Sequence, residues 1–276
     1  MTVPDSLRAR APSAAGDHDE PTLLGVVNLS PESMVRDSIV RDPDEALERA
    51  RGLLADGVHL IDLGGRSITP DAPVVDDDEE QRRLRPTAAR LRAERVAFSI
   101  DTWSPATAIE ALGWGASMIN FTGQDATAEM LDAIARAEAS VVLTYMPHGN
   151  AYEMRSRPHP PPRADLVGEI LEFLAPRVEA ARAAGVREVI VDPNLGILPA
   201  ETNDYEKIHL QLDIVWQTER LRDLGCPLLF YAARKPERLA RIMMASAVLH
   251  AGPEYVRTHE PRILRELAKA ARRGAA

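Results

Sequence analysis

The sequence predicts a single closed (β/α)₈ barrel, and three observations support that fold. Short apolar segments alternate with amphipathic segments eight times along the 276 residues, a pattern typical of βαβ units around a parallel sheet. The length is close to the roughly 250 residues of a typical barrel. Most of the apolar segments also end in a charged or amide side chain, and barrel enzymes carry their sites at the carboxyl ends of the strands.

The eight expected strands are short and mainly aliphatic, as the layers inside a barrel require. They span residues 23–29, 59–65, 97–102, 117–122, 140–146, 188–194, 227–233 and 255–259. The polar residues at or near their carboxyl ends are Asn28, Asp62, Asp101, Asn120, Asp192, Lys235, Arg257 and His259.

Start and stop signals of helices separate these strands. Asp42 before Pro43 predicts a helix start, Ser104 before Pro105 predicts another, and long helical segments are expected over 165–184 and from Glu237 to the region of Gly252. A last helix is expected after Glu260. The acidic run 76–80 is expected to be a helix N-terminus, where acids complement the helix dipole, in preference to a metal site.

Three longer segments fit neither helix nor strand, namely 30–41, 66–78 and 147–163. Each follows a predicted strand and would lie at the carboxyl mouth of the barrel, where long loops act as lids or substrate clamps. Residues 1–20 are polar and are expected to form a loosely attached arm, which leaves 21–276 for the barrel.

Composition excludes several classes of protein. The formal net charge of −9 provides no broad basic surface, so neither nucleic acid nor an anionic membrane is an expected partner. Cys226 is the single cysteine, which excludes a disulfide scaffold. No apolar segment approaches the roughly 20 residues that span a bilayer. A cytoplasmic protein is expected.

Four of the strand-end residues form the strongest candidate site. Asp101, Asn120, Asp192 and Lys235 follow different strands and should project toward one mouth of the barrel. Two carboxylates can accept the paired N–H donors of a flat amino-pyrimidinone ring, while an amide and an ammonium can bind its carbonyl and ring nitrogens.

A second polar group is expected from the first and last strands. It consists of Asn28, Arg257 and His259, of which Arg257 and His259 suit a phosphate or diphosphate. Any one of these residues taken alone could be a loop cap or an ion-pair partner, and it is their convergence that favours a site. The sequence lacks a His-Glu-x-x-His pattern and a cysteine cluster, which disfavours a hydrolytic zinc centre.

At these positions the chain resembles the dihydropteroate synthase family of pterin-binding barrels. The similar segments occur in the family's order and cover essentially residues 22–270. They are 25–33 (GVVNLSPES), 61–67 (IDLGGRS), 99–102 (SIDT), 119–120 (IN), 191–193 (VDP), 234–235 (RK) and 256–259 (VRTH).

The resemblance implies a reaction and a set of roles. Asp101, Asn120, Asp192 and Lys235 would bind a reduced pterin, with Asp101 and Lys235 acting in catalysis. Arg257 and His259 would face a diphosphate leaving group, and Mg²⁺ would be held by that diphosphate and Asn28. An amine such as p-aminobenzoate would then attack the methylene carbon of a hydroxymethyl-dihydropterin diphosphate and release diphosphate.

The departures from the family pattern fall on the amine and diphosphate side. Residues 66–71 read RSITPD where the family has ESTRPG, residues 34–38 read MVRDS in place of the usual first-loop tail, and 194–199 read NLGILP where an aromatic residue is expected. Arg66 is a candidate to replace the missing loop arginine and to bind the same anion.

Alternatives to the synthase remain open. They are a pterin-binding protein without synthase activity, a pterin-dependent methyltransferase, and a barrel enzyme with other chemistry. A homodimer is also plausible, because the predicted helix over 242–250 carries more apolar residues than a solvated helix needs. Packing of that helix on the barrel would explain the same residues.

Overall fold

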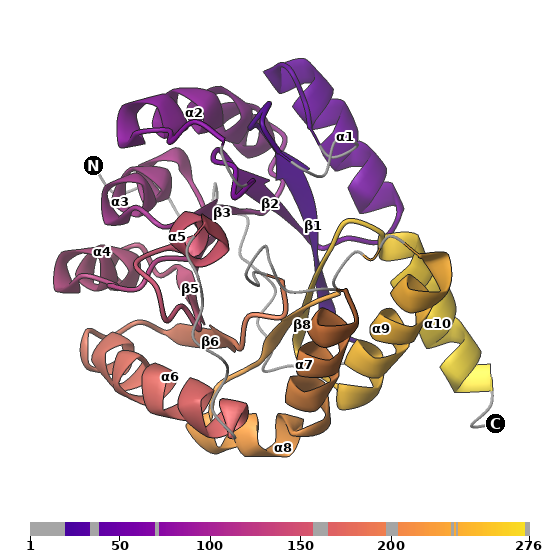
Figure 1. The fold of residues 1–276 in the computed structure, drawn as a ribbon. Helices are drawn as coiled ribbons and strands as arrows, with labels where there is room; N and C mark the ends of the chain where they lie inside the picture. The colour runs from indigo at the N-terminus through magenta and orange to yellow at the C-terminus, as the bar shows by residue number, and fades with distance from the viewer. Residues whose placement is uncertain are drawn as a thin grey trace.

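The structure is a computed structural model that describes residues 20–33, 39–69, 72–156, 165–196, 204–232, 235 and 237–273. Eight strands in this part form one all-parallel sheet in the order β6-β5-β4-β3-β2-β1-β8-β7 (Figure 1). The strands are β1 Thr22–Asn28, β2 Leu60–Gly64, β3 Phe98–Thr102, β4 Met118–Phe121, β5 Ser140–Thr144, β6 Glu188–Asp192, β7 Leu229–Tyr231 and β8 Tyr255–Thr258.

The sheet closes between β6 and β7 through a single parallel bridge. Val191 pairs with Leu228 there, and the N–H of Val191 donates to the carbonyl of Pro227 at 3.0 Å. The predicted barrel is therefore confirmed. Each expected strand is present, and the boundaries differ from the predicted ones by only a few residues.

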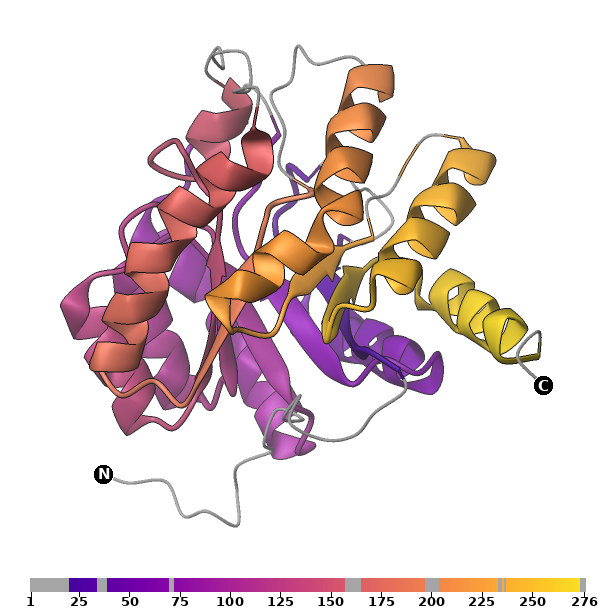
Figure 2. The same cartoon turned by 90° about the horizontal axis from the view of Figure 1, so that it is seen from below.

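Helices surround the strands, as Figures 1 and 2 show. They are α1 Pro43–Ala55, α2 Asp77–Ala93, α3 Pro105–Trp114, α4 Ala128–Arg136, α5 Ala151–Ser156, α6 Leu166–Ala183, α7 Asp204–Trp216, α8 Thr218–Leu221, the 3₁₀ turn Arg222–Leu224, α9 Arg238–Ala251 and α10 Pro261–Arg273. None of the helices in the described part of the chain combines the length and the apolar character that crossing a bilayer requires.

The predicted helix signals act as expected. The carboxylate of Asp42 accepts the N–H groups of Asp44 and Glu45 at the start of α1, and the hydroxyl of Ser104 accepts the N–H of Thr107 at the start of α3. The acidic run is a helix N-terminus, with Asp76 as its cap. At the end of α3, Gly115 adopts φ +102°, a conformation that a residue with a Cβ rarely tolerates.

One local prediction was wrong. The segment 147–163 contains the short helix α5 (Ala151–Ser156), although its sequence shows no helical periodicity. Asn150 accepts the N–H of Glu153 at 2.9 Å, and Ala151 and Met154 pack against Met146. Tertiary packing thus holds a helix too short to be stable alone. The proline run of this segment lies outside the described residues.

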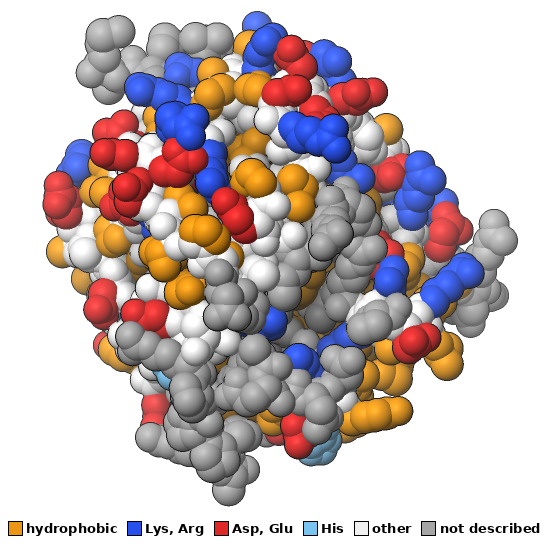
Figure 3. All heavy atoms as spheres, turned by 45° about the horizontal axis from the view of Figure 1, so that its top comes forward, with side chains coloured by type: hydrophobic (Ala, Val, Ile, Leu, Met, Phe, Trp, Pro, Cys, Tyr) orange, Lys and Arg blue, Asp and Glu red, His pale blue; other side chains and the backbone are white. Residues whose placement is uncertain are grey.

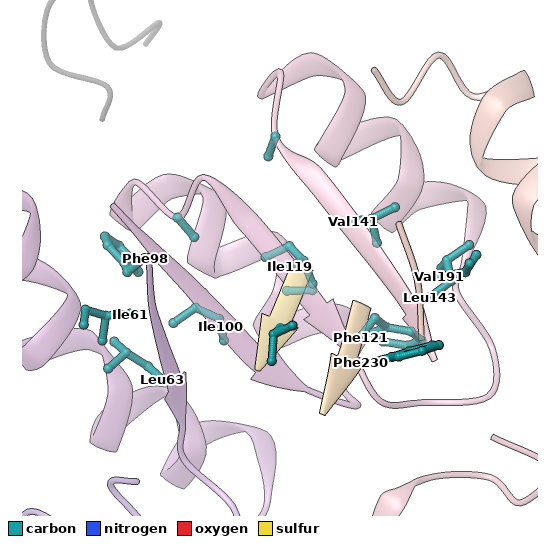
Figure 4. Packing of buried hydrophobic residues seen from close by; sticks show 14 of the residues in the cluster. Ile61, Leu63, Phe98, Ile100, Ile119, Phe121, Val141, Leu143, Val191 and Phe230 are labelled. Carbon is teal, nitrogen blue, oxygen red and sulfur yellow. The ribbon is translucent and has the colours of Figure 1, made fainter. Parts of the chain in front are cut away.

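Two apolar layers hold the barrel together. The inner layer lies inside the barrel, below the carboxyl ends of the strands. It consists of Leu24, Leu60, Met118, Val142, Ile190, Leu229 and Tyr255. The outer layer lies between strands and helices, and Figure 4 shows part of it, including Ile61, Phe98, Ile119, Val141 and Val191. The interior is therefore a packed core, and a site is expected at the carboxyl ends of the strands.

Charged side chains of both signs lie close together on one face of the molecule. On the face seen in Figure 3, basic and acidic side chains are intermingled over the same elements. The absence of a nucleic-acid partner, expected from the net charge, stays a prediction.

Candidate functional site

The alternation of the strands creates a polar ring above the inner apolar layer. Successive side chains of a strand point to opposite faces, so the residue two positions after an inward apolar residue also points inward. These pairs are Leu60 and Asp62 on β2, Met118 and Asn120 on β4, Val142 and Thr144 on β5, Ile190 and Asp192 on β6, Leu229 and Tyr231 on β7, and Tyr255 and Arg257 on β8. The parallel direction of all strands brings the polar members to the same rim.

Asp62 is the central acceptor of this ring. Its carboxylate is fully buried and accepts the Ser99 hydroxyl at 2.6 Å, Nε of Arg257 at 2.6 Å and the side-chain amide of Asn120 at 3.3 Å. One buried carboxylate thus orients a hydroxyl, a guanidinium and an amide that come from three other strands. A buried charge is tolerated when it is paired and hydrogen-bonded in this way.

Asp101 lies on the other side of the same guanidinium. Its Oδ2 is 2.8 Å from Nη2 of Arg257, and its Oδ1 accepts the Thr122 hydroxyl at 3.2 Å. Burial raises the pKa of Asp101 to about 6, against the opposing effect of Arg257, and the negative charge of Asp62 adds to the increase. Burial alone would lower the pKa of Arg257, but Asp62 and Asp101 together raise it, so the guanidinium remains charged.

Asp192 supplies the third carboxylate, at the end of β6. Its Oδ1 accepts the backbone N–H of Asn194 at 2.7 Å, a turn for which Asn194 adopts φ +67°. Burial raises the pKa of Asp192 to about 7, although the N–H of Asn194 and the charge of Arg257 act in the opposite direction. Asp192 is therefore close to its point of titration at neutral pH.

Two buried polar atoms on the ring have no hydrogen-bond partner among the described residues. They are Oδ1 of Asn120 and Oγ1 of Thr144, on side chains that are at most 3% exposed. Buried polar groups in native proteins nearly always have a partner, and an exception at a concave site points to a bound ligand or water.

Aromatic rings complete the mouth on the side of β7 and β8. The guanidinium of Arg257 lies 5.6 Å from the Tyr231 ring centroid, and His259 contacts the same ring edge-on at 6.0 Å. The loop after β6 packs directly on this ring, because a Cβ on Gly196 would come within 2.7 Å of Tyr231 Cδ1. A flat polar ligand would therefore meet an aromatic wall.

Lys235 lies buried beside α7. Its ammonium donates to Oε1 of Gln211, and the amide of Gln211 in turn donates to the carbonyl of Leu195, close to Asp192 in the chain. Lys235 is thus linked to the loop after β6, whereas Asp101 and Asn120 are linked through Asp62 and Arg257. These two sets of hydrogen bonds fix the positions of Lys235, Asp101 and Asn120.

Arg66 follows β2 and pairs with the first turn of α2. Its guanidinium donates to Asp77, lies 3.4 Å from Glu80 and sits 5.0 Å from the Trp103 ring centroid. Burial raises the pKa of the fully buried Glu80 to about 7, and the charge of Arg66 counteracts that increase. The prediction that Arg66 binds an anion stays a prediction, since here its charge is matched by carboxylates.

Asn28 has the right chemistry to assist a magnesium ion that is coordinated mainly by the oxygens of a bound diphosphate. The Asn28 amide nitrogen donates to the Ser33 hydroxyl at 3.3 Å, and its carbonyl oxygen is the hard donor that Mg²⁺ prefers. No cluster of three or more metal-ligating side chains occurs in the described part of the chain. A cation here would need phosphate oxygens to complete its coordination.

The first and second loops are fastened to each other beside Asn28. The backbone carbonyl of Glu32 accepts the hydroxyls of Ser67 at 3.0 Å and Thr69 at 2.7 Å, and its carboxylate pairs with Arg83 of α2 at 3.1 Å. The described part of loop 1 therefore has a fixed position at the mouth.

The observed site differs from the predicted one in how its residues are grouped. Arg257 lies between the carboxylates of Asp62 and Asp101. Its expected contact with a leaving diphosphate, together with Asn28 and His259, stays a prediction. Asp62 and Thr144 were not predicted as site residues. The strand periodicity could have found both, because each lies two residues after an apolar residue of the inner layer.

The arrangement suits a flat heterocycle that carries several N–H donors. Carboxylates at Asp101 and Asp192 and the amide oxygen of Asn120 can accept hydrogen bonds from such a ring, and Lys235 can donate to its carbonyl or ring nitrogen. The low dielectric of a buried rim strengthens these charged hydrogen bonds.

Comparisons with known proteins identify similar chains. The family described as pterin binding enzyme matches residues 24–269. The dihydropteroate synthase of Bacillus subtilis is 31% identical over 274 residues, covering 94% of this chain and 90% of that protein.

Solved structures agree with this similarity. A dihydropteroate synthase of Yersinia pestis in a sulfonamide drug complex has a TM-score of 0.78 and 25% identity, over 92% of this chain and 94% of that one. A Xanthomonas albilineans dihydropteroate synthase with 4-aminobenzoic acid has a TM-score of 0.76 and 27% identity, over 94% of each chain.

Proposed function

This chain belongs to the family of pterin-binding enzymes, and from that membership we propose that it is a dihydropteroate synthase-like transferase. It joins a hydroxymethyl-dihydropterin diphosphate to p-aminobenzoate or a related amine and releases diphosphate. The main support is the polar ring, in which buried acceptors with raised pKa or without a partner face the space that a pterin would occupy.

The ring binds and orients the pterin. Asp101, Asp192 and Asn120 accept N–H groups of the amino-pyrimidinone edge, and Lys235 donates to the opposite side of the heterocycle. Asp62 does not need to touch the pterin, because it positions Asn120 and Arg257 through the hydrogen bonds described above.

The reaction transfers the methylene carbon of the pterin from diphosphate oxygen to the amine nitrogen. The C–O bond to diphosphate breaks, a C–N bond forms, and the amine loses one proton. Positive charge that develops on the pterin is stabilised by the carboxylates of Asp101 and Asp192. Bound Mg²⁺, held by Asn28 and the diphosphate, would neutralise charge on the leaving group. His259, which directly follows β8, would bind the same anion.

Arg66 is proposed as a further contact to the leaving diphosphate. To reach it, the guanidinium exchanges the carboxylates of Asp77 and Glu80 for phosphate oxygens, which are equally good partners for a bidentate arginine. The Arg66→Met variant should therefore raise the KM for the pterin diphosphate while it leaves the affinity for the pterin without diphosphate unchanged.

The direct test uses the purified full chain, 6-hydroxymethyl-7,8-dihydropterin diphosphate, Mg²⁺ and a panel of arylamines that includes p-aminobenzoate. We expect release of diphosphate and a condensed product of the corresponding mass, both abolished by EDTA. The Asp101→Asn variant should be severely impaired, while Asp78→Asn, an exposed acid of α2, serves as the matched control.

Two results would contradict this function. Pterin binding without turnover on any amine would instead identify a pterin-binding protein that lacks synthase activity. Failure to bind the pterin by calorimetry would refute the assignment of the ring itself.

We also propose that the protein is a cytoplasmic homodimer. Leu239 and Met243 are exposed on α9, and Tyr205 and Trp216 are exposed on the adjacent helix α7. Met244 and Val248 of the same helix are buried, so packing on the barrel accounts for these two residues but not for the exposed ones. Light scattering should give twice the mass of the chain, and Leu239→Glu should reduce it to that of a monomer. Cell fractionation tests the location.

A further inference from the structure

Thr144 is the last residue of β5 and a polar residue of the ring that the proposed reaction does not use. It follows Val142, a member of the inner apolar layer, by two positions, so its side chain faces the barrel interior. Its neighbours Val141 and Leu143 face the helices on the other side of the strand (Figure 4). The direction of Thr144 is therefore set by the pleat of β5.

The surroundings of Thr144 place it among the proposed pterin-binding residues. It pairs with Asp192 in the register of β5 and β6, and Val142, two residues before it, pairs with Asn120 of β4. Thr144 thus occupies the strand between the two that provide Asn120 and Asp192. The side chains of all three face the same upper end of the barrel.

The hydroxyl of Thr144 is buried without a hydrogen-bond partner among the described residues. The residue is 3% exposed, and its Oγ1 neither donates to nor accepts from any described protein group. Such a group destabilises a protein, because the hydrogen bonds it made to water are not replaced. Valine has nearly the same shape and would fill the position without that cost. A hydroxyl here is explained if a ligand becomes its partner.

We propose that Thr144 forms a hydrogen bond with the heterocycle bound at this rim and is a specificity-determining residue of the site. This inference rests on the proposed function, since it requires a pterin between Asn120 and Asp192. A hydroxyl can both donate and accept, so it can pair with a ring nitrogen or with an N–H group. Thr144 then pairs with a polar atom of the bound heterocycle, which an aliphatic residue would leave unpaired.

Thr144→Val tests the proposal against a matched control. The probe is 6-hydroxymethylpterin, and its affinity is measured by calorimetry on the full chain. Thr87 of α2 provides the control, because its hydroxyl is also buried without a described partner, but it lies in a helix outside the barrel. Thr144→Ser retains the hydroxyl and serves as the conservative variant.

The two valine variants should separate binding from stability. Both should raise the melting temperature of the protein without pterin, or leave it unchanged, because each removes an unpaired buried hydroxyl. Only Thr144→Val should weaken pterin binding, by about five- to tenfold, which is the effect of one lost hydrogen bond. Thr144→Ser should remain within about threefold of the wild type, since its hydroxyl can make the same hydrogen bond.

The outcomes distinguish this inference from the function on which it rests. If the wild type binds the pterin and Thr144→Val binds it equally well, the hydrogen bond does not exist and Thr144 has no role in recognition. Equal losses in Thr144→Val and Thr87→Val would refute it as well, because they would indicate a general effect on the fold. If the wild type itself does not bind the pterin, the proposed function fails first. A crystal structure with the pterin should place Oγ1 of Thr144 within hydrogen-bond distance of a ring heteroatom.

Discussion

The Asp62→Asn substitution tests the network that organises the ring. The new side chain has nearly the same shape but provides a single oxygen in place of two, and it directs an NH₂ group toward other donors. Three donors meet the carboxylate of Asp62, from Ser99, Arg257 and Asn120. At least one of them must lose its acceptor, and the guanidinium loses one of its two counter-charges.

The expected loss follows from the burial of the ion pair. Removing one partner of a buried pair costs about 3–5 kcal/mol, because the remaining charge is left uncompensated. Arg257 keeps Asp101 as a partner, and its side chain is 17% exposed, which moderates the loss. We therefore expect the free energy of unfolding to fall by about 2–3 kcal/mol. For a chain of this size the melting temperature should fall by roughly 4–10 °C.

Urea denaturation of Asp62→Asn, Arg257→Met and the double variant measures this directly. The double variant should be more stable than the sum of the single losses predicts, because removing both partners leaves no unpaired charge. Asp56→Asn is the matched control, since Asp56 pairs with the exposed Arg262, and surface pairs contribute at most about 1 kcal/mol. Pterin affinity should fall in Asp62→Asn as well, because Asn120 loses its orientation.

Two results would refute this reasoning. One is a loss in Asp62→Asn no larger than that in the surface control. The other is strict additivity in the double variant, which would mean that Asp62 and Arg257 stabilise the protein independently.

Two further predictions concern the same rim. Pterin affinity should be at least about tenfold higher at pH 8 than at pH 6, because burial raises the pKa of Asp192 to about 7 and only the ionised carboxylate accepts two N–H donors. Asp192→Asn should remove most of this dependence and leave the smaller part that comes from Asp101, whose pKa is raised to about 6. A wild-type affinity independent of pH would count against the assignment. Gly196→Ala should weaken pterin binding and lower the free energy of unfolding by about 1–3 kcal/mol, because the new Cβ would lie 2.7 Å from the ring of Tyr231. An unchanged pterin affinity in calorimetry and an unchanged melting temperature would show that the loop can shift to make room.

The fold could be predicted from the sequence because its signals are local. Asp42 and Ser104 specify helix starts through their own side-chain hydrogen bonds, and Gly115 specifies a helix end through its positive φ. The helix α5 escaped prediction because its cluster with Met146 is covered by Ile68, Trp103 and Phe173, which come from distant parts of the chain. Sequence periodicity cannot report such contacts when the helix is shorter than two turns.

The strand-end positions of the candidate residues were predictable, whereas their pairing was not. Strand ends and family motifs identified Asp101, Asn120, Asp192, Lys235 and Arg257, because a parallel barrel brings the carboxyl ends of its strands to one rim. They did not reveal that Arg257 lies between Asp62 and Asp101, since the partner of a buried charge depends on barrel stagger and on the rotamers of several strands.

The sequence alone therefore determined the eight-stranded barrel, the order of its elements and the strand-end positions of the candidate residues, because hydrophobic periodicity and capping are encoded over a few neighbouring residues. Only the tertiary structure decided which of those residues pair with one another. It also showed that Arg66 joins the acids of α2 and that the buried hydroxyl of Thr144 has no partner in the described part of the chain. Burial, charge pairing and hydrogen-bond satisfaction depend on groups that are far apart in the chain and meet only when the barrel closes.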